Sequence, residues 1–385
     1  MKRILIIGHE AERTGAPIVL LHLLRWIKKN RPEFDVEMLL LRDGELHASY
    51  EELVTVYVAP QTRLPKIVVR GLRFLRRKLG LTRKVKLSDL PPLDVEYGLV
   101  FGNTVASLEY LEFFKARGFH TICWLHEMRS VIESFLPKPG RFAELAKSVD
   151  VFIVASEAVE SVVREFGITN RTEIVHEFSE LDPVNQEDAA SVRRSLGIPP
   201  DAFVVGGSGT VSSRKGTDLF IDIASRLTSS LPEIYFVWVG GGGGSGYSAA
   251  EFEHAVAEID RLGLTRVLIT GAQKTPGNYF ANLDVFALTS REDPFPLVCL
   301  EAASLGKPII CFEGAGGMPE FVGDDAGSVV PLGDTQAFAD AILEYYRDRS
   351  KLIAAGKAAN RKINSEFSLD SSCRRISDLI LQLMD

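Results

Sequence analysis

The stretch Ser290-Arg291-Glu292-Asp293-Pro294-Phe295-Pro296-Leu297-Val298-Cys299-Leu300-Glu301-Ala302-Ala303 lies between two short apolar segments. The segment before it, Asp284–Leu288, and the segment after it, Ile309–Phe312, have the length and composition of buried strands. The stretch therefore predicts a strand-to-helix crossing in an open parallel sheet. We expect Asp293 on the loop and Glu301 about two turns into the helix.

This crossing has the chemistry of a ligand site. Open parallel sheets bind ligands at the carboxyl ends of their strands. The amides of Phe295–Val298 would lie free at the helix N-terminus, where they can bind an anion. Two carboxylates for hydroxyl groups and a set of amides for phosphate predict a site for a sugar nucleotide. The alternative is one solvated acid on a loop and another on an exposed helix face.

The spacing Asp293-x7-Glu301 resembles the acid-x7-acid motif of retaining glycosyltransferases of family 4. Those enzymes have the GT-B fold, an α/β fold of two Rossmann-like doubly wound domains facing across a cleft. The resemblance implies that Asp293 contacts the donor sugar as a catalytic residue and that Glu301 holds the ribose hydroxyls. The family usually has Glu at the first position. The shorter Asp293 leaves the adjacent Glu292 as an alternative contact for the sugar.

Composition limits the possible classes of protein. The chain has 385 residues, of which 46% are hydrophobic, and a formal net charge of −7. These values predict two ordinary domains and argue against a nucleic-acid-binding protein. Four cysteines lie far apart, and Cys123, Cys299 and Cys311 fall in apolar runs, which favours buried thiols in a reducing cytosol. The first apolar run is short, which indicates a strand rather than a signal peptide, and no run has the length of a membrane span.

Short apolar runs alternate with amphipathic segments along the whole chain, which predicts parallel sheets. The strands expected in the first half are Ile4–Ile7, Val36–Leu40, Val54–Val58, Leu99–Phe101, Thr121–Leu125, Val151–Val154 and Glu173–Val175. Those expected in the second half are Phe203–Gly206, Tyr235–Val239, Val267–Thr270, Asp284–Leu288, Ile309–Phe312 and Ser328–Val330. We expect an N-terminal acceptor-binding domain over 1–180 and a nucleotide-sugar-binding domain over 181–367. The resemblance implies that a C-terminal helix, 368–385, packs back on the N-terminal domain.

A second loop in the C-terminal half has the composition of a phosphate site. The segment from Gly206 to Asp218 is rich in small residues, follows a strand and opens a helix. It resembles the family's glycine-then-Lys-Gly loop, which implies that Lys215 binds the donor diphosphate and takes part in catalysis. The family often has an arginine at the position of Thr210. Either Arg214 replaces it or the hydroxyls of Thr210 and Ser212 contact the phosphate instead, and the alternative to a phosphate site is a solvated turn.

The remaining donor contacts follow from the same resemblance. The strand end at Val267–Gly271 matches the place where backbone groups read the nucleobase, so Gly271 is included. The expected donor-binding residues are Gly15, Thr210, Arg214, Lys215, Gly271, Asp293, Phe295, Pro296, Leu297, Val298 and Glu301.

In the first half, a glycine-containing loop follows the first strand and leads into an apolar helix, Ile18–Trp26. Gly15 matches the family glycine that approaches the donor phosphate and the acceptor; a plain strand–helix turn is the alternative. His9, Glu10 and Arg13 on this loop are candidate acceptor contacts.

Two other strand ends carry polar residues. His126 follows the strand Thr121–Leu125, and Asn103 follows Leu99–Phe101. The resemblance implies that His126 lies close to the reacting sugar and is catalytic, whereas a structural histidine is the alternative. Asn103 is a candidate acceptor contact. His176-Glu177-Phe178 replaces the Asn-Gly-Val-Asp that many family members have near the hinge.

The expected chemistry needs basic groups that stabilise a departing diphosphate. The resemblance implies that the anomeric configuration is retained and that the reaction needs no metal ion and no cofactor other than the nucleotide diphosphate sugar. The sequence also contains no Asp-x-Asp motif, which would have indicated a metal site. Residues 63–86 contain ten Lys or Arg and no acid, with leucines at helical spacing. This segment predicts either a contact with an anionic membrane surface or a solvated helix with its leucines in the core.

The resulting hypothesis is a cytoplasmic enzyme, peripheral on the inner membrane face, that transfers a hexose from a UDP-sugar to a lipid-linked glycan acceptor in cell-surface polysaccharide biosynthesis. Two alternatives stay open. One is a sugar-nucleotide epimerase of the same fold, and the other is a non-catalytic nucleotide-sugar or glycan-binding protein. A dinucleotide oxidoreductase is disfavoured because the first strand is not followed by GxGxxG.

Overall fold

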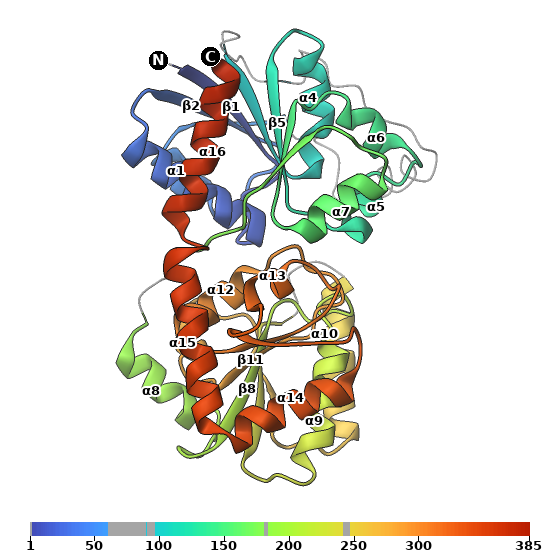
Figure 1. Cartoon of the computed structure of the whole chain (residues 1–385), viewed down its shortest axis with the longest axis vertical. Coiled ribbons are helices and arrows are strands. Elements are labelled where there is room, and N and C mark those ends of the chain that lie inside the picture. The colour runs from blue at the N-terminus through green and yellow to red at the C-terminus, as the bar shows by residue number, and fades with distance from the viewer. Residues whose placement is uncertain (1, 61–89, 91–96, 181–183, 242–246) are drawn as a thin grey trace. The chain divides into compact units, whose positions relative to one another are not determined.

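The computed structural model describes residues 2–60, 90, 97–180, 184–241 and 247–385. The chain forms two compact units (Figure 1). The first unit contains Met1–Glu177 and Leu369–Asp385, and the second contains Phe178–Ser368. The division after Glu177 lies close to the boundary that the sequence places near residue 180. The basic segment 63–86 lies outside the described residues.

The first unit is built on a parallel sheet of seven strands in the order β3-β2-β1-β4-β5-β6-β7. Its strands are β1 (Lys2–Gly8), β2 (Phe34–Leu40), β3 (Thr55–Val58), β4 (Leu99–Asn103), β5 (His120–Leu125), β6 (Val151–Val154) and β7 (Arg171–Ile174). The central strands are buried on both faces, which explains their almost continuous apolar sequences.

Helices connect these parallel strands. They are α1 (Gly15–Asn30), α2 (His47–Glu51), the 3-10 helix η2 (Val105–Ser107), α4 (Leu108–Lys115), α5 (Arg129–Phe135), α6 (Arg141–Ala146), α7 (Glu157–Glu165) and the C-terminal α16 (Leu369–Met384). In Figure 1, α16 runs beside α1. The indole Nε1 of Trp26 donates to Asp370 Oδ1 at 2.8 Å, and Arg31 Nε donates to Ser377 Oγ at 3.0 Å. The last helix of the chain therefore completes the first unit.

The second unit has a parallel sheet of six strands in the order β10-β9-β8-β11-β12-β13. The strands are β8 (Phe203–Ser208), β9 (Ile234–Val239), β10 (Val267–Ile269), β11 (Val285–Leu288), β12 (Ile309–Phe312) and β13 (Gly327–Val330). The helices are α8 (Gln186–Ser195), α9 (Thr217–Thr228), α10 (Tyr247–Arg261), α11 (Pro276–Phe280), α12 (Leu297–Ser304), α13 (Met318–Val322), α14 (Thr335–Arg347) and α15 (Arg349–Ser365).

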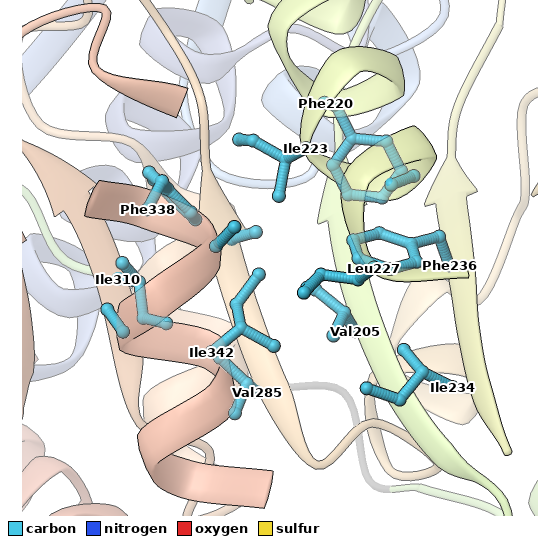
Figure 2. Close-up of a cluster of buried hydrophobic side chains, with 14 of the residues drawn as sticks. Val205, Phe220, Ile223, Leu227, Ile234, Phe236, Val285, Ile310, Phe338 and Ile342 are labelled. Atoms are coloured by element: carbon cyan, nitrogen blue, oxygen red, sulfur yellow. The ribbon is translucent and has the colours of Figure 1, made fainter. Parts of the chain in front are cut away.

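The core of the second unit lies between the sheet and two of its helices (Figure 2). Phe220, Ile223 and Leu227 recur on one side of α9 and pack against Phe236 of β9 and other strand residues. Phe338 and Ile342 from α14 contact the same cluster. Burying a side chain of this size contributes about 1.5–3 kcal/mol. This packing fixes α9, and with it the loop that leads into the helix.

Both sheets have the doubly wound strand order, in which the direction of winding reverses once. The reversal lies between β1 and β4 in the first unit and between β8 and β11 in the second. In such sheets ligands bind at the carboxyl ends of the strands that flank the reversal. Each strand in the described part of the chain overlaps one expected from the sequence, so the predicted pair of Rossmann-like domains is confirmed.

Candidate functional site

The strongest candidate site lies in the second unit, at the reversal between β8 and β11. The loop after β8 carries Thr210, Arg214 and Lys215, and α9 begins at Thr217. The buried indole of Trp238 donates through Nε1 to the carbonyl oxygen of Gly209 at 3.0 Å. Thr210 is exposed, whereas Lys215 is partly buried. The start of the loop is thus anchored on the core, and its polar residues lie at the carboxyl edge of the sheet.

Lys215 and Asp293 form an ion pair, with Nζ 2.6 Å from Oδ2. The side chain of Lys215 is 15% exposed and that of Asp293 is 6% exposed. Ser290 Oγ donates to the same Oδ2 at 3.1 Å. The structure thus brings together two residues that the sequence predicts as donor contacts, one from each loop at the reversal.

Other contacts hold these two loops together. Arg214 Nη1 donates to the carbonyl oxygen of Glu292 at 2.8 Å, and the amide of Arg291 donates to the carbonyl of Arg214. The guanidinium of Arg291 makes two bonds to the carboxylate of Asp218 in α9, at 2.7 and 2.6 Å. Bidentate pairs of this kind fix orientation as well as distance. Arg214 therefore has a structural partner in addition to its predicted phosphate-binding role.

Glycines allow the close backbone approach that the site requires. At Gly316, which has φ +147, an added Cβ would lie 1.6 Å from the carbonyl oxygen of Asp293. At Gly216, with φ +67, it would lie 1.8 Å from the carbonyl oxygen of Thr289. Both spacings are impossible for a side-chain carbon. The backbone on either side of Asp293 is consequently held by direct contact with neighbouring loops.

The helix after this loop corrects two expectations. Helix α12 begins at Leu297, so Glu301 is its fifth residue and lies just over one turn, not two, from its start. Pro296 occupies the N-cap and has no N–H, so it cannot donate to a phosphate. The amides of Leu297 and Val298 donate to no acceptor among the described residues, as expected for a first helical turn.

The other predicted donor contacts lie around this helix. The ring of Phe295 is buried and stacks on Phe367, so its side chain is part of the core. Ser179 Oγ donates to Glu301 Oε1 at 3.4 Å. Gly271 follows β10, has φ +72 and forms an isolated bridge with Gly240.

The loop after β1 in the first unit carries the candidate acceptor contacts. Arg13 and Gly15 are exposed, and Gly15 is the first residue of α1. His9 Nε2 lies 3.4 Å from Glu10 Oε1, and Glu10 also pairs with Arg42. The hydrogen bond from His9, opposed by burial and assisted by the charges of His9 and Arg42, lowers the pKa of Glu10 below its ordinary value. Glu10 is therefore held as a carboxylate.

His126 and Asn103 meet at the neighbouring strand ends of the same unit. His126 Nε2 lies 2.8 Å from Asn103 Oδ1, and His126 Nδ1 lies 2.8 Å from Glu177 Oε1. The side chains of His126 and Glu177 are 4% and 6% exposed. Both ring nitrogens of His126 therefore have partners. The sequence places His126 and Asn103 at this edge but gives no role to Glu177.

The turn after Asn103 is strained. Thr104 has φ 81 and ψ 163, a combination that is essentially restricted to glycine. It directs the amide of Val105 toward the buried carboxylate of Glu127, with both oxygens at 3.2 Å. Burial raises the pKa of Glu127, and the nearby His126 acts in the opposite direction. Strain of this kind is typical of functional sites.

Sequence reasoning missed two residues of these arrangements, namely Glu177 and Ser290. Each of them follows a strand at the same edge as a predicted residue. The signal that could have found them is a polar residue within three positions of the end of an apolar run. Ser290 is the clearest case, because it is buried and lies two residues after β11.

The described residues offer no cluster of metal ligands, no membrane-spanning helix and no exposed thiol. They contain no group of three His, Cys, Asp or Glu side chains that could hold a metal ion, and no helix among them is long and apolar enough to cross a membrane. All four cysteines are free and buried, and burial raises the pKa of Cys311 to about 12.

Solved structures share this fold over nearly the whole chain. The chain aligns over 99% of its length, and 100% of the other chain, with Anabaena HepE in complex with UDP-glucose, at 22% identity and a TM-score of 0.79. It aligns with sucrose-phosphate synthase from Thermosynechococcus elongatus over 100% of this chain and 99% of that one, at 19% identity and a TM-score of 0.75. The chain thus has the GT-B fold.

Sequence comparison finds a family model that matches part of the chain. Residues 188–362 match the model described as glycosyl transferases group 1. The matched residues include Lys215, Asp293 and Glu301.

Curated relatives match part of the chain. The lipopolysaccharide core biosynthesis mannosyltransferase LpsB of Rhizobium meliloti is 28% identical over 202 residues, which are 51% of this chain and 56% of the relative. The alpha-galactosylglucosyldiacylglycerol synthase of Streptococcus pneumoniae is 28% identical over 253 residues, which are 62% of this chain and 66% of the relative. The chain therefore spans less than two thirds of the length of these relatives.

Proposed function

We propose that this protein is a retaining glycosyltransferase of family 4 that transfers a hexose from a UDP-sugar to a glycan acceptor. One observation carries the proposal. Lys215 and Asp293 meet at 2.6 Å on the loops that follow β8 and β11, the two strands that flank the reversal of the second sheet. Glu301 lies on the helix that follows the second of these loops. This combination offers a cation and free amides for a diphosphate and carboxylates for hydroxyl groups.

The proposed reaction needs the sugar–phosphate bond to break with negative charge developing on the diphosphate. Lys215 and the amides of Leu297 and Val298 would stabilise that charge. No metal ion is required in this scheme, because basic and amide groups supply the stabilisation. We assign the contact with the donor sugar to Asp293 and the contact with the ribose hydroxyls to Glu301.

Support for the donor and the acceptor comes from the similar proteins. The HepE structures hold UDP, UDP and glucose, or UDP-glucose, which favours a UDP-sugar donor here. Two relatives are named for lipopolysaccharide core and glycosyldiacylglycerol synthesis, which favours a lipid-linked acceptor and a role in cell-surface polysaccharide biosynthesis. We place the enzyme in the cytoplasm, peripheral on the membrane, with His9, Glu10, Arg13 and Asn103 on the acceptor side.

The test is thermal unfolding with UDP-, GDP- and ADP-sugars. A ligand at about a hundred times its Kd should add about 2.7 kcal/mol to the stability of the protein that binds it. We expect a shift with UDP-sugars that is reduced in Glu301→Ala, because hydrogen bonds to a charged group contribute about 1.5–3 kcal/mol. Glu253→Ala is the matched control, because Glu253 is exposed on α10 of the same unit. No shift with any sugar nucleotide would refute the proposal.

Measuring turnover distinguishes glycosyl transfer from the two alternative functions, epimerisation and non-catalytic binding. Incubation with UDP-glucose and a lipid-linked acceptor should give a glycosylated product and UDP, and NMR of the product should show a retained anomeric configuration. A change in the sugar without an acceptor would identify an epimerase. Binding without either product would identify a non-catalytic binding protein.

A further inference from the structure

The ring of His126 lies between two groups that accept hydrogen bonds. Nδ1 is 2.8 Å from a carboxylate oxygen of Glu177, and Nε2 is 2.8 Å from Asn103 Oδ1. A neutral imidazole has one N–H donor and one acceptor, whereas an imidazolium has two donors. When Glu177 is a carboxylate, both acceptors are satisfied only by the imidazolium.

The orientation of the Asn103 amide is itself fixed by a contact. Its Nδ2 lies 3.3 Å from the carbonyl oxygen of Ala16 and donates to it. Reversing the amide would place Oδ1 against that carbonyl, and two acceptors would then face each other. The surroundings therefore favour the orientation in which Oδ1 accepts from Nε2.

We propose that Glu177 and Asn103 hold His126 as an imidazolium, with Glu177 as the positioning residue that keeps it charged and oriented. The inference rests on the proposed function for its consequence. An imidazolium has no lone pair with which to accept a proton, so His126 serves the transferase as a cationic hydrogen-bond donor and not as a general base.

The charges around His126 are consistent with a cation. Besides Glu177, the buried Glu127 is adjacent in sequence and interacts electrostatically with both His126 and His9. The amide of His126 donates to Glu127 Oε2 at 3.0 Å. A buried carboxylate without a partner charge is costly, so a positive His126 ring, paired with Glu177 and electrostatically attracted to Glu127, lowers the cost of burying these two carboxylates.

The position of Glu177 gives the pair a second consequence. Glu177 is the last residue of the first unit, three residues after β7, and Phe178 begins the second unit. The amide of Val175 donates to the carbonyl of Val154, which extends the pairing of β7 and β6 by one residue. The ion pair therefore attaches the residue at the junction of the two units to the candidate site at the end of β5.

The test is ¹⁵N NMR of the histidine ring nitrogens in the unliganded protein, with His126 assigned by its loss in His126→Gln. At about pH 8, well above the ordinary histidine value of 6.5, we expect both ring nitrogens of His126 to be protonated. In Glu177→Gln we expect the neutral ring at the same pH. Glu173→Gln is the matched control, because it removes a half-exposed carboxylate from the same strand and should leave the His126 signals unchanged.

Two results would overturn the inference. One is a neutral His126 ring in the wild-type protein at that pH, a measurement that does not depend on the folding of Glu177→Gln. The other is an unchanged imidazolium in Glu177→Gln. The spectrum needs neither a donor nor an acceptor, so an inactive protein would count against the proposed function without affecting this result. If the protein is active, Glu177→Gln should lower kcat by about tenfold or more at pH 8 and recover at lower pH, because acid restores the charge. A purely structural role for Glu177 would give no such recovery.

Discussion

Replacing Lys215 by Met should destabilise the second unit through Asp293 rather than through lost packing. The two side chains are similar in length, so the apolar stem can be retained while the charge is removed. The carboxylate of Asp293 is 6% exposed and, among the residues that the structure describes, would keep only the hydroxyl of Ser290 as a side-chain partner. The perturbation therefore leaves a buried charge without its counter-ion.

The magnitude follows from that burial. Removing one partner of a buried ion pair costs about 3–5 kcal/mol. Because Ser290 still donates one hydrogen bond to Asp293, we expect about 3 kcal/mol, or a fall in Tm of roughly 6–12 °C for a unit of this size. Asp293→Asn should cost less, about 1 kcal/mol, because Lys215 is more exposed and its ammonium can reach water. The double variant should be closer to wild type than Lys215→Met alone.

The assay is a double-mutant cycle by urea unfolding, with the second unit followed through Trp238. Lys274→Met is the control, because Lys274 is an exposed lysine in the same unit. We expect a coupling energy between Lys215 and Asp293 of about 1.5–3 kcal/mol. Additivity within about 0.5 kcal/mol would refute the reasoning, since it would mean that the two charges do not interact in solution.

Three further predictions concern stability. Gly316→Ala should lower the free energy of unfolding by more than about 3 kcal/mol, because the new Cβ would lie 1.6 Å from the carbonyl oxygen of Asp293. Gly271→Ala has open space around its Cβ and should lower that free energy by only about 1–2 kcal/mol, the cost of a positive φ for a residue with a side chain. Equal values for the two variants in urea unfolding would contradict this reasoning. Thr104→Gly should relieve backbone strain and leave the free energy of unfolding unchanged or raised by up to about 1 kcal/mol, and a loss of more than that would show that Thr104 is unstrained. The folded-state pKa of Glu10 lies below its ordinary value of 4.5, so the stability that Glu10 contributes is complete above pH 4.5 and is lost as the pH falls through the lowered value. In Glu10→Gln the free energy of unfolding should therefore fall less steeply with decreasing pH in the acid range. An unchanged dependence on pH in that range would contradict the assignment.

The sheets could be predicted because their strands are buried on both faces. Val151–Val154 and Ile309–Phe312 have the same bounds in the sequence analysis and in the structure, since each is a short, uninterrupted run of buried apolar side chains. Asp284 was expected inside a strand but precedes β11. Its carboxylate instead accepts hydrogen bonds from the amide of Val204 and the guanidinium of Arg349. Neither the hydrophobic periodicity nor the composition of the sequence indicates these contacts.

The position of Glu301 within its helix was wrong because the start of that helix depends on proline chemistry. Pro294 and Pro296 disfavour helical backbone in the residues that precede them, so the helix cannot include Phe295, and it begins at Leu297. Attention to that rule would have shortened the predicted helix. The sequence could place Lys215 and Asp293 at one edge of the sheet, but not their pairing, because they are 78 residues apart and their contact depends on how both loops fold. The same holds for His126 and Glu177, which are 51 residues apart.

The charges of the two loops at the reversal have a consequence for donor recognition. Arg214, Lys215 and Arg291 are balanced by Glu292, Asp293 and the Asp218 carboxylate at the start of α9, so the two loops and the first turn of α9 together carry no net formal charge. Lys215 and Arg291 are moreover paired directly with acids in the unliganded protein. A diphosphate alone would therefore meet a neutral surface and must compete with Asp293 for the lysine. Under the proposed function, much of the affinity for a sugar nucleotide therefore comes from its nucleoside and sugar, through the contacts proposed for Glu301 and Asp293. A site of this kind discriminates against simple phosphates, which lack those two groups.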